Sequence, residues 1–463
     1  MQKLKKLQNK KIALLGLGIE NFSLAKFLLA KKIPCEITIC DRKSKKNLGE
    51  KYEELKKHKN INWRMGKYYN KNLNKFDVLF RSPGWPLFSP CIQKILTAKS
   101  LQLKVTSPMQ LFFEICPTKN IIGVTGTKGK GTTAGLIYEI LKTGFERATT
   151  NNAHTNEKTK KQVWLGGNIG KAPFDFLIKI KKTDWVVLEL SSFQLEYMTI
   201  SPHISVMTNF YPEHLAPADP NNPNFHKTLA DYWQAKNNIF KWQNKKDWAI
   251  INCQLRITKY KLDTEAKIIY FKKSELPSKL IGEHNKENIA AAVEVAKIIG
   301  INKNTIAKAV KNFKGLPHRL ELVKIINGVR YYDDSFATTP ESTIIALKSF
   351  TAPIVILLGG ADKGANFKKL AKEVKNKVKF VILLKGDSTI KIKKELLKTG
   401  FKLRNIRLID NIKDAVKIAE ENSATGDVVL LSTACASFGM FKNYKERGEL
   451  FKQAVNKIKT KLS

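Results

Sequence analysis

Short apolar runs alternate with longer amphipathic stretches through most of the chain. Near the beginning, residues 11–18 (KIALLGLG), 35–41 (CEITICD) and 77–85 (DVLFRSPGW) have the pattern of strands, and residues 21–32 (NFSLAKFLLAKK) have that of a helix. Strands that alternate with helices are typical of a parallel sheet covered by helices. We therefore predict one α/β domain over residues 1–117.

The alternation continues beyond a predicted hinge at residues 116–118, Cys-Pro-Thr. A second α/β domain is predicted at 118–315, with one strand that begins at Ile121, further strands at 186–189 and 204–209, and helices near 232–240 and 287–299. A third is predicted at 316–463, with strands at 328–333, 354–358, 380–384 and 428–431 between lysine-rich amphipathic segments.

The composition agrees with several domains. A chain of 463 residues with 43% hydrophobic content indicates about three domains rather than one core. No apolar stretch approaches the ~18 residues of a membrane span, and the basic start leads into a strand–helix pattern rather than a cleavage site, so we expect a cytoplasmic protein. Six scattered cysteines without a C-x-x-C pair indicate reduced thiols.

The formal charge of +42 raises the question of nucleic-acid binding. Only ten of the 82 basic residues are arginine, and the lysines are spread along the whole chain. Base recognition favours arginine and a concentrated patch, whereas dispersed lysine mainly keeps the surface solvated and draws anions loosely toward it. The charge therefore suits anionic substrates and argues against nucleic acid as a partner.

The strongest chemical signal is the segment IIGVTGTKGKGTT at 121–133. Its glycines, Gly126, Gly129 and Gly131, allow the backbone to bring N–H groups against phosphate oxygens, and Lys130 adds a positive charge. The following residues have helical spacing, so a helix N-terminus would point at the anion. This pattern predicts a nucleotide triphosphate site, although an ordinary glycine-rich turn is the alternative.

The segment departs from the strict phosphate-loop pattern, in which a serine or threonine follows the lysine. Gly131 stands at that position. If the loop binds Mg²⁺, the hydroxyl of Thr132 or Thr133 has to replace the missing one.

Three further side chains are candidates for chemistry near such a loop. Glu189 ends a strand that is apolar throughout, which places a carboxylate at the edge of the sheet beside the loop, where it binds metal or forms a salt bridge. His214 follows another strand and is a candidate imidazole ligand or a solvated loop histidine. Spacing alone does not distinguish Lys236 from the many other lysines.

Weaker signals leave their alternatives open. Gly16 and Gly18 follow the first strand and Asp41 ends the second, as in a dinucleotide site, but Asn21 occupies the third glycine position, so nicotinamide use and another nucleotide both stay possible. Asn285 and Asn288 open a predicted helix and could cap it or cover an adenine. Asp333 and Asp334, which precede Ser335, could form a turn or contact a nucleotide.

Taken in order, these segments resemble the Mur ligase family, and within it the branch that adds glutamate. The resemblance covers nearly the whole chain and rests on GVTGTKGKGTT (123–133), GGNIG (166–170), LELSSFQLE (188–196), TNFYPEH (208–214), AK (235–236), GEHNKENIAAA (282–292), GLPHRLE (315–321), DDSFATTPEST (333–343), LLGGADKGANF (357–367) and LLSTACASFGMFKNYKERG (430–448). ELSSFQLE is the segment that distinguishes this branch from its sister ligases.

The resemblance implies an α/β protein of three domains: a Rossmann-like N-terminal domain for the UDP substrate, a central P-loop ATPase domain with a mostly parallel sheet, and a Rossmann-like C-terminal domain that binds glutamate and contacts ADP. It implies that ATP activates the carboxylate of UDP-N-acetylmuramoyl-L-alanine as an acyl phosphate, which the amine of glutamate then attacks, in peptidoglycan precursor synthesis. The expected cofactors are ATP and Mg²⁺, and the expected state is a monomer without nucleic-acid or membrane partners.

The resemblance also implies roles for individual residues. The catalytic residues would be Lys130, Glu189, His214 and Lys236, the last carbamylated, and the Mg²⁺ ligands would be Glu189, His214, Lys236 and Thr132. ATP would contact Gly126, Thr127, Lys128, Gly129, Lys130, Gly131, Thr132, Thr133, Asn285, Asn288, Arg319 and Asp334. The UDP substrate would contact Gly18, Ile19, Asp41, Arg42, Ser82, Gly84 and Asn168, and glutamate would contact Lys363, Ser437 and Tyr444.

One departure bears on the glutamate site, because Phe336 stands where many relatives carry a lysine. Several alternatives stay open at this stage. They are addition of L-glutamate rather than D-glutamate, another amide ligase of the Mur or folylpolyglutamate type, and a noncatalytic nucleotide-dependent protein that binds nucleic acid.

Overall fold

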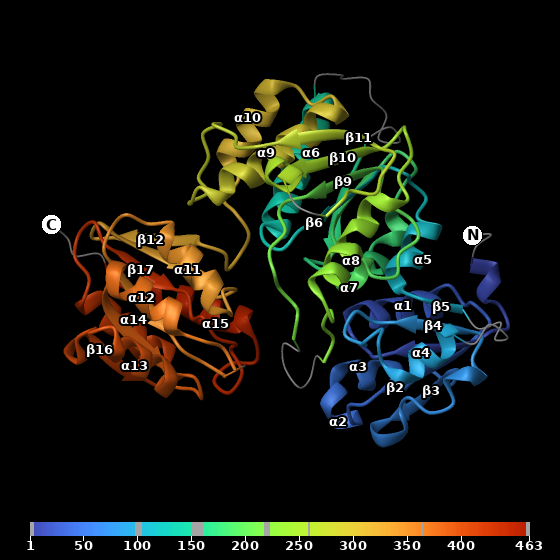
Figure 1. The fold of residues 1–463 in the computed structure, drawn as a ribbon, viewed down its shortest axis with the longest axis horizontal. Coiled ribbons are helices and arrows are strands. Elements are labelled where there is room, and N and C mark those ends of the chain that lie inside the picture. The colour runs from blue at the N-terminus through green and yellow to red at the C-terminus, as the bar shows by residue number, and fades with distance from the viewer. Residues whose placement is uncertain are drawn as a thin grey trace. The chain divides into compact units, whose positions relative to one another are not determined.

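The computed structural model describes residues 4–97, 104–150, 161–216, 223–257, 260–362 and 364–459. Contacts within the chain divide it into two units, which comprise residues 1–276 with 287–310 and residues 277–286 with 311–463. Among the described residues, the first unit contains two parallel sheets and the second contains one mixed sheet (Figure 1). The described helices include none with the length and apolar character that a bilayer crossing requires.

The N-terminal sheet has the strand order β3-β2-β1-β4-β5, with every pair parallel. Its strands are β1 (Lys11–Leu15), β2 (Glu36–Asp41), β3 (Ile61–Met65), β4 (Val78–Arg81) and β5 (Lys104–Thr106). The helices around it are α1 (Ile19–Ala30), α2 (Lys45–Leu48), α3 (Glu50–Leu55), α4 (Pro90–Thr97) and α5 (Pro108–Ile115), with 3-10 turns η1 (Leu4–Leu7), η2 (Gly66–Tyr68) and η3 (Leu73–Lys75).

Several boundaries differ from the sequence prediction, and two of them lie near the turn between β1 and α1. The predicted strand 77–85 ends at Arg81, because the Trp85 N–H bonds back to the Ser82 carbonyl at 3.0 Å in a turn that contains Pro83 and Gly84. The predicted helix 21–32 begins at Ile19. The end of β4 and the start of α1 both border the turn between β1 and α1, which is where a ligand would bind in such a sheet.

The central sheet has the order β11-β10-β9-β6-β8-β7, again entirely parallel. Its strands are β6 (Ile121–Thr125), β7 (Val163–Gly167), β8 (Trp185–Glu189), β9 (Ile204–Met207), β10 (Trp248–Asn252) and β11 (Lys267–Phe271). The associated helices are α6 (Lys130–Thr150), α7 (Ser192–Leu195), α8 (Leu229–Lys241), α9 (His284–Ile299) and α10 (Lys303–Asn312), with 3-10 turns η5 (Pro173–Asp175), η6 (Leu177–Lys179) and η7 (Cys253–Ile257). Since β6 lies between β8 and β9, the ends of these three strands meet at one edge of the sheet.

The sheet of the second unit has the order β12-β13-β17-β14-β15-β16, parallel except for the pair β12 and β13. Its strands are β12 (Glu321–Ile326), β13 (Val329–Asp333), β14 (Ile354–Leu358), β15 (Val378–Leu384), β16 (Ile406–Ile409) and β17 (Val428–Leu431). Its helices are α11 (Pro340–Lys348), α12 (Lys368–Lys377), α13 (Thr389–Lys398), α14 (Ile412–Glu421) and α15 (Tyr444–Asn456), with the 3-10 turn η8 (Leu403–Asn405).

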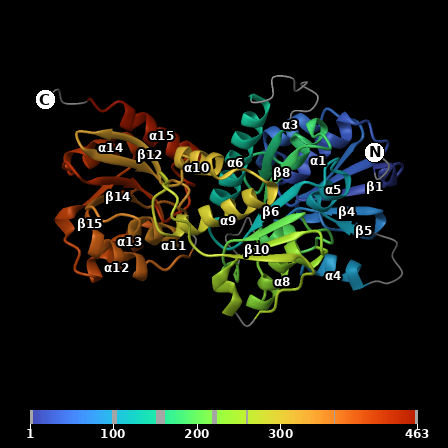
Figure 2. The ribbon, with the colours of Figure 1, turned by 90° about the horizontal axis from the view of Figure 1, so that it is seen from above.

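Helices cover both faces of this second-unit sheet (Figure 2). Along β14, Ile354 and Ile356 pack into one cluster with residues of α11, α12 and α13, whereas Val355 and Leu357 pack into another with residues of α14 and α15. Successive side chains of a strand point to opposite faces, so an apolar run such as IVILL requires cover on both sides.

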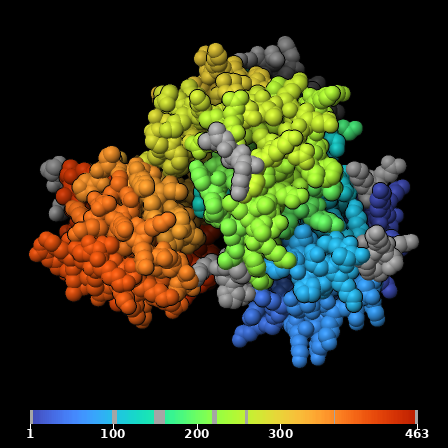
Figure 3. Space-filling model, in the orientation of Figure 1, coloured from blue at the N-terminus to red at the C-terminus, as the bar shows by residue number. Residues whose placement is uncertain are grey.

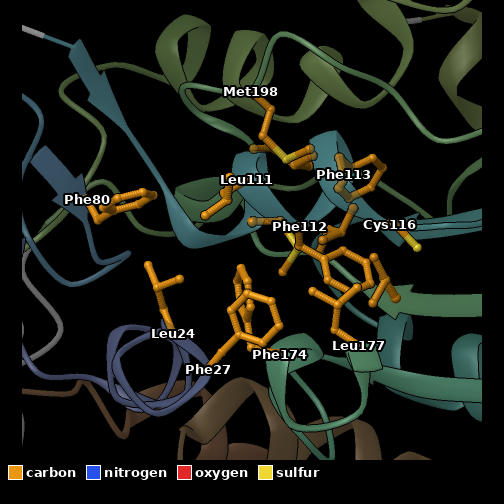
Figure 4. Packing of buried hydrophobic residues seen from close by; sticks show 14 of the residues in the cluster. Leu24, Phe27, Phe80, Leu111, Phe112, Phe113, Cys116, Phe174, Leu177 and Met198 are labelled. Atoms are coloured by element: carbon orange, nitrogen blue, oxygen red, sulfur yellow. The ribbon is translucent and has the colours of Figure 1, made fainter. Parts of the chain in front are cut away.

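The two sheets of the first unit share one hydrophobic core, shown in Figure 4. Phe27 of α1 and Phe112 of α5 pack against Phe174 of η5, with ring centroids 5.1 and 6.2 Å apart respectively. The buried Arg81 guanidinium adds polar links, donating to the carbonyls of Trp85 at 2.8 Å and Phe193 at 3.0 Å. The N-terminal and central parts of this unit are accordingly in close contact in the space-filling view (Figure 3).

Candidate active site

The predicted phosphate loop connects β6 to α6, as the sequence indicates. Gly126 has φ 140° and Gly129 has φ 81°, both in the region that favours glycine. A Cβ at Gly126 would overlap the Thr208 hydroxyl, and one at Gly129 would overlap the Asn288 side chain. Both glycines are therefore required by backbone conformation and by close packing.

Asn209 fixes the shape of this loop. Its Oδ1 accepts hydrogen bonds from the backbone N–H groups of Thr127 at 3.2 Å and Lys128 at 2.8 Å, and its Nδ2 donates to the Lys128 carbonyl at 3.0 Å. In this structure the N–H groups of Thr127 and Lys128 are therefore used in hydrogen bonds that hold the loop in shape. The N–H groups of the first turn of α6, which have no preceding helical carbonyls to bond, are oriented for an anion.

Lys130 is the first residue of α6, and its ammonium group lies over the loop. It donates to the carbonyls of Gly126 at 3.0 Å and Thr127 at 2.9 Å. Thr133 is buried and its hydroxyl donates to Asn288 Oδ1 at 3.2 Å, whereas Thr132 stays partly exposed in the first helical turn. Of the two threonines, Thr132 is the better replacement for the hydroxyl that Gly131 lacks.

Glu189 ends β8 beside the loop and is 3% exposed. Its Oε1 accepts a hydrogen bond from Asn168 Nδ2 at 3.0 Å, and its Oε2 is buried without a hydrogen-bond partner among the described residues. A buried carboxylate oxygen without a partner is costly in free energy. A divalent cation would supply the missing interaction, since hard cations take carboxylate oxygens as ligands.

Lys236 lies on α8 and is 1% exposed, with its amine directed at the same loop. Nζ donates to the Gly126 carbonyl at 2.7 Å and lies 4.8 Å from the centre of the Tyr232 ring. Burial, followed by the positive charge of Lys130, holds the pKa of Lys236 well below its ordinary value. This lysine differs from the lysines on the surface, and a neutral amine is accessible to it.

His214 has a left-handed backbone with φ 59°, a conformation that is uncommon outside glycine and is found at constrained functional positions. Partial burial lowers the pKa of its imidazole, the Glu213 carboxylate opposes this effect, and the charges of nearby lysines add to it. The His214 side chain is 39% exposed, so screening by solvent limits how far its pKa falls. The neutral imidazole is the form that binds metal.

The seven residues predicted to contact the UDP substrate lie together. They line one cavity of about 360 Å³ in the first unit, namely Gly18, Ile19, Asp41, Arg42, Ser82, Gly84 and Asn168. Asp41 orders the turn at its floor, because its Oδ2 accepts from the Leu17 N–H at 2.7 Å. Two residues that the sequence analysis did not single out, Glu20 and Gln194, also line this cavity.

The remaining predicted contacts belong to the second unit, except for Asn288. Asn285 follows the first residue of α9 and donates to the Ile281 carbonyl at 2.7 Å. Ser437 is buried and Tyr444 begins α15, whereas Lys363 lies outside the described residues. These residues remain predictions for ATP and glutamate binding.

Arg319 lies in a constrained loop of the second unit, between His318 with φ 64° and Leu320 with φ 44°. The last residue of β13 and the residue after it stabilise this loop. Asp333 Oδ2 pairs with His318 Nδ1 at 2.7 Å, and Asp334 Oδ1 accepts from the Leu320 N–H at 3.2 Å. Burial raises the pKa of Asp334 to about 7.

The Arg319 guanidinium stacks on the ring of Phe336. The guanidinium carbon lies 3.7 Å from the Phe336 ring centre, and the same ring meets Tyr444 edge-to-face at 5.0 Å. Buried Arg447 supports this arrangement, donating from Nη2 to the Ser335 carbonyl at 2.7 Å and from Nε to the Ser335 hydroxyl at 2.9 Å. Phe336, Arg319 and Tyr444 thus form one packed cluster at this position.

Comparison with known proteins identifies three family regions in the chain. Residues 10–102 match the Mur ligase MurD-like N-terminal domain, residues 124–271 match the Mur ligase middle domain, and residues 318–435 match the Mur ligase glutamate ligase domain. The middle region contains the phosphate loop, Glu189, His214 and Lys236.

Curated relatives match over nearly their full length. The UDP-N-acetylmuramoylalanine--D-glutamate ligases of Clostridium tetani and Acetivibrio thermocellus are 38% and 36% identical to this chain, covering 97% and 98% of it and the same shares of their own lengths. Among solved structures, the UDP-N-acetylmuramate-alanine ligase of Thermotoga maritima superposes with a TM-score of 0.56 at 17% identity, covering 97% of this chain and 99% of its own. The MurF ligase of the same organism, in complex with ADP, has a TM-score of 0.55 at 16% identity, covering 98% and 97%. The chain therefore belongs to the Mur ligase family and has its three-domain α/β fold.

Proposed function

We propose that this protein is an ATP-dependent ligase that joins D-glutamate to UDP-N-acetylmuramoyl-L-alanine in cytoplasmic peptidoglycan precursor synthesis. The observation that carries the proposal is the grouping of Lys130, Lys236 and Glu189 around one phosphate loop, with an unpartnered carboxylate oxygen and a buried amine. The similarity to the UDP-N-acetylmuramoylalanine--D-glutamate ligases of Clostridium tetani and Acetivibrio thermocellus supports the choice of substrates.

The reaction has two chemical steps, phosphoryl transfer and amide formation, and the protein would assist each in a different way. First, the alanyl carboxylate attacks the γ-phosphorus of ATP, forming an acyl phosphate and releasing ADP. Lys130 and the first-turn N–H groups of α6 would neutralise the negative charge of the transferring phosphoryl group. Then the amine of glutamate attacks the acyl carbon, and the tetrahedral intermediate collapses to an amide, inorganic phosphate and a proton.

The donor set around the loop fits Mg²⁺. Glu189 offers a buried oxygen without a partner, Thr132 a partly exposed hydroxyl, and His214 an imidazole held in its neutral form. When bound, the ion would supply positive charge that offsets the negative charge of the transferring phosphoryl group. We propose these residues, together with a carbamylated Lys236, as its ligands.

The remaining roles complete the proposal. The UDP moiety would bind in the cavity of the first unit, within an N-terminal domain at 1–117, and the ATPase would comprise 118–315. A C-terminal domain at 316–463 would bind glutamate through Lys363, Ser437 and Tyr444 and would bring Arg319 and Asp334 to the nucleotide. We propose a monomer, because none of these roles requires a second chain.

Carbamylation of Lys236 would follow from its environment. The neutral amine attacks carbon dioxide, a C–N bond forms, one proton leaves, and the side chain becomes an anion. Lys236→Ala is expected to lower kcat about 10²-fold, with partial recovery in formate or acetate, because a small carboxylate can replace the lost anion. Phosphate release measures both effects.

The matched control for this variant is Lys241→Ala, an exposed position on the same helix, where no change is expected. A ¹³C-bicarbonate label should also give a carbamate carbonyl NMR signal in the native protein and none in Lys236→Ala. Unchanged turnover in Lys236→Ala, or no recovery in either carboxylate, contradicts the assignment.

The proposed reaction is tested by incubating the protein with ATP, Mg²⁺ and UDP-N-acetylmuramoyl-L-alanine, with D-glutamate and L-glutamate in separate reactions. We expect phosphate release and an amide product with the D form. Product with the L form alone corrects the stereochemistry. Phosphate release only with a folate substrate supports the folylpolyglutamate alternative, and retention on DNA without turnover supports a nucleic-acid-binding protein.

A further inference from the structure

The Thr127 hydroxyl connects three segments of the first unit. It accepts a hydrogen bond from the Tyr211 N–H at 2.9 Å, donates to the Tyr211 carbonyl at 3.2 Å, and lies 3.2 Å from the Tyr232 hydroxyl. A threonine hydroxyl has one proton and accepts two hydrogen bonds, so these three contacts use its whole capacity and Tyr232 is the donor in the third. The phosphate loop, the segment that leads to His214 and helix α8 are therefore joined at one oxygen atom.

Neighbouring rings fix the direction in which the Tyr232 hydroxyl points. Tyr232 is fully buried, and its ring stacks on Phe210 with the centroids 5.2 Å apart and lies at the same distance from His226. Burial raises the pKa of Tyr232, although the hydrogen bond with Thr127 acts in the opposite direction. The hydroxyl accordingly keeps its proton and remains a donor to the phosphate loop.

Tyr232 and Lys236 bond to successive residues of the phosphate loop from the same face of α8. They are four positions apart, which makes them neighbours on the helix surface, with Lys236 Nζ 4.8 Å from the centre of the Tyr232 ring. Lys236 donates to the Gly126 carbonyl at 2.7 Å, and Tyr232 donates to the next residue, Thr127. The two bonds together set the distance between α8 and the loop.

The two bonds respond differently to the proposed carbamylation of Lys236. A carbamate nitrogen carries one proton, and the side chain is then an anion rather than a cation, so the bond to the Gly126 carbonyl would lose its charge assistance. The bond between Tyr232 and Thr127 joins two neutral hydroxyls and loses no proton. Tyr232 is thus a contact between α8 and the loop that requires no positive charge on Lys236.

We propose that Tyr232 is a positioning residue for phosphoryl transfer, which acts through Thr127 by keeping the phosphate loop docked on α8. This inference rests on the proposed function. The Gly126 carbonyl accepts from Lys130 Nζ at 3.0 Å as well as from Lys236, so the two amines meet at one atom of the loop. A shift of the loop away from α8 would separate the cation proposed to face the phosphoryl group from the proposed metal ligand. A misplacement of about 1 Å can cost about 10²-fold in rate.

Tyr232→Phe tests this role because it removes one oxygen atom and keeps the ring. We expect kcat to fall about 10- to 10²-fold. Titration calorimetry should show ADP binding about threefold weaker, because a loop that is less ordered beforehand loses more conformational freedom on binding. UDP-N-acetylmuramoyl-L-alanine should bind as in wild type, because Tyr232 does not line the cavity of the first unit. A mere loss of folded protein would instead lower the apparent kcat and leave both dissociation constants unaltered.

Variants of Thr127 test whether the effect passes through this residue. Thr127→Val removes the acceptor and keeps the shape of the side chain, so Tyr232→Phe should lower kcat no further in that background. Thr127→Ser keeps the hydroxyl and should have a kcat within about threefold of wild type. The Val and Ser variants also test the proposal if Tyr232→Phe does not fold. Losses that multiply in the double variant, or a Thr127→Val protein as active as wild type, overturn the proposal.

Tyr68→Phe is the matched control, because it removes a tyrosine hydroxyl from an exposed site on η2 and should change neither kcat nor the two dissociation constants. Thermal unfolding checks that each variant is folded. A Tyr232→Phe protein with wild-type kcat, or with the same loss of affinity for ADP and for the UDP-sugar, contradicts the positioning role. Wild-type protein that does not convert the UDP-sugar refutes the proposed function itself, a separate result, since ADP binding by Tyr232→Phe still reports on the loop.

Discussion

Lys130→Ala is expected to lower kcat by about 10³-fold or more while the protein stays folded and still binds UDP-N-acetylmuramoyl-L-alanine. The ammonium group lies 3.0 and 2.9 Å from two carbonyls of the phosphate loop, so it is already positioned above the place where phosphate would bind. Its charge is needed most when negative charge shifts during phosphoryl transfer, and side chains with this role commonly contribute factors of about 10³–10⁵. Phosphate release at saturating substrates measures the effect.

Lys142→Ala serves as the matched control, because this lysine is exposed further along the same helix. It should leave kcat and the melting temperature unchanged. A Lys130→Ala enzyme that works within tenfold of wild type would show that the loop lysine is dispensable, and the proposed role would have to be abandoned.

Glu189→Gln is expected to lower kcat by about 10³-fold and to raise the Mg²⁺ concentration needed for half-maximal activity. Glutamine preserves the size of the side chain and can still accept from Asn168, whose Nδ2 lies 3.0 Å from Oε1 of Glu189. It removes the negative charge at Oε2, the buried oxygen without a partner, and that charge is what a dication would bind. The measurement is the initial rate as a function of Mg²⁺ at fixed ATP.

The exposed Glu36→Gln variant should reproduce the wild-type Mg²⁺ curve, which excludes a general effect of lost surface charge. If Glu189→Gln lowers the rate but leaves the Mg²⁺ dependence unaltered, Glu189 does not bind the metal. If both quantities stay at wild type, the carboxylate has no catalytic role.

The fold and the centre of the site could be predicted from the sequence because their signals are local. An apolar strand, a glycine turn and a periodic helix follow one another from Ile121 to Leu141, and the structure has β6, the loop and α6 in that order. Glu189 was similarly apparent as a carboxylate at the end of an apolar strand. Pattern alone missed β3, β5, β7, β10, β11, β12 and β16. In β12 and β16, alternating polar residues leave several side chains exposed.

The residues that shape the site from a distance could not be predicted in this way. Asn209 restrains Thr127 and Lys128 from 82 and 81 positions along the chain, and Gln194 aligns Glu20 from 174 positions away. Neither asparagine nor glutamine has a local sequence signature for such bonds, which exist only once the strands are adjacent. Asn209 lay inside a matched motif, but nothing in the motif indicated its function.

Phe336 illustrates the opposite case, in which the sequence identified an anomaly and the structure explains what it does. The resemblance leads us to expect a lysine at this position. The Phe336 ring instead stacks on the Arg319 guanidinium at 3.7 Å and packs edge-to-face against Tyr444.

The shared interior of the first unit has a consequence for its stability. Because Phe27, Phe112 and Phe174 belong to one packed cluster that includes residues of both sheets, a substitution that leaves a void there removes contacts from both at once. The N-terminal and central sheets are therefore expected to lose stability together and to unfold as one cooperative unit.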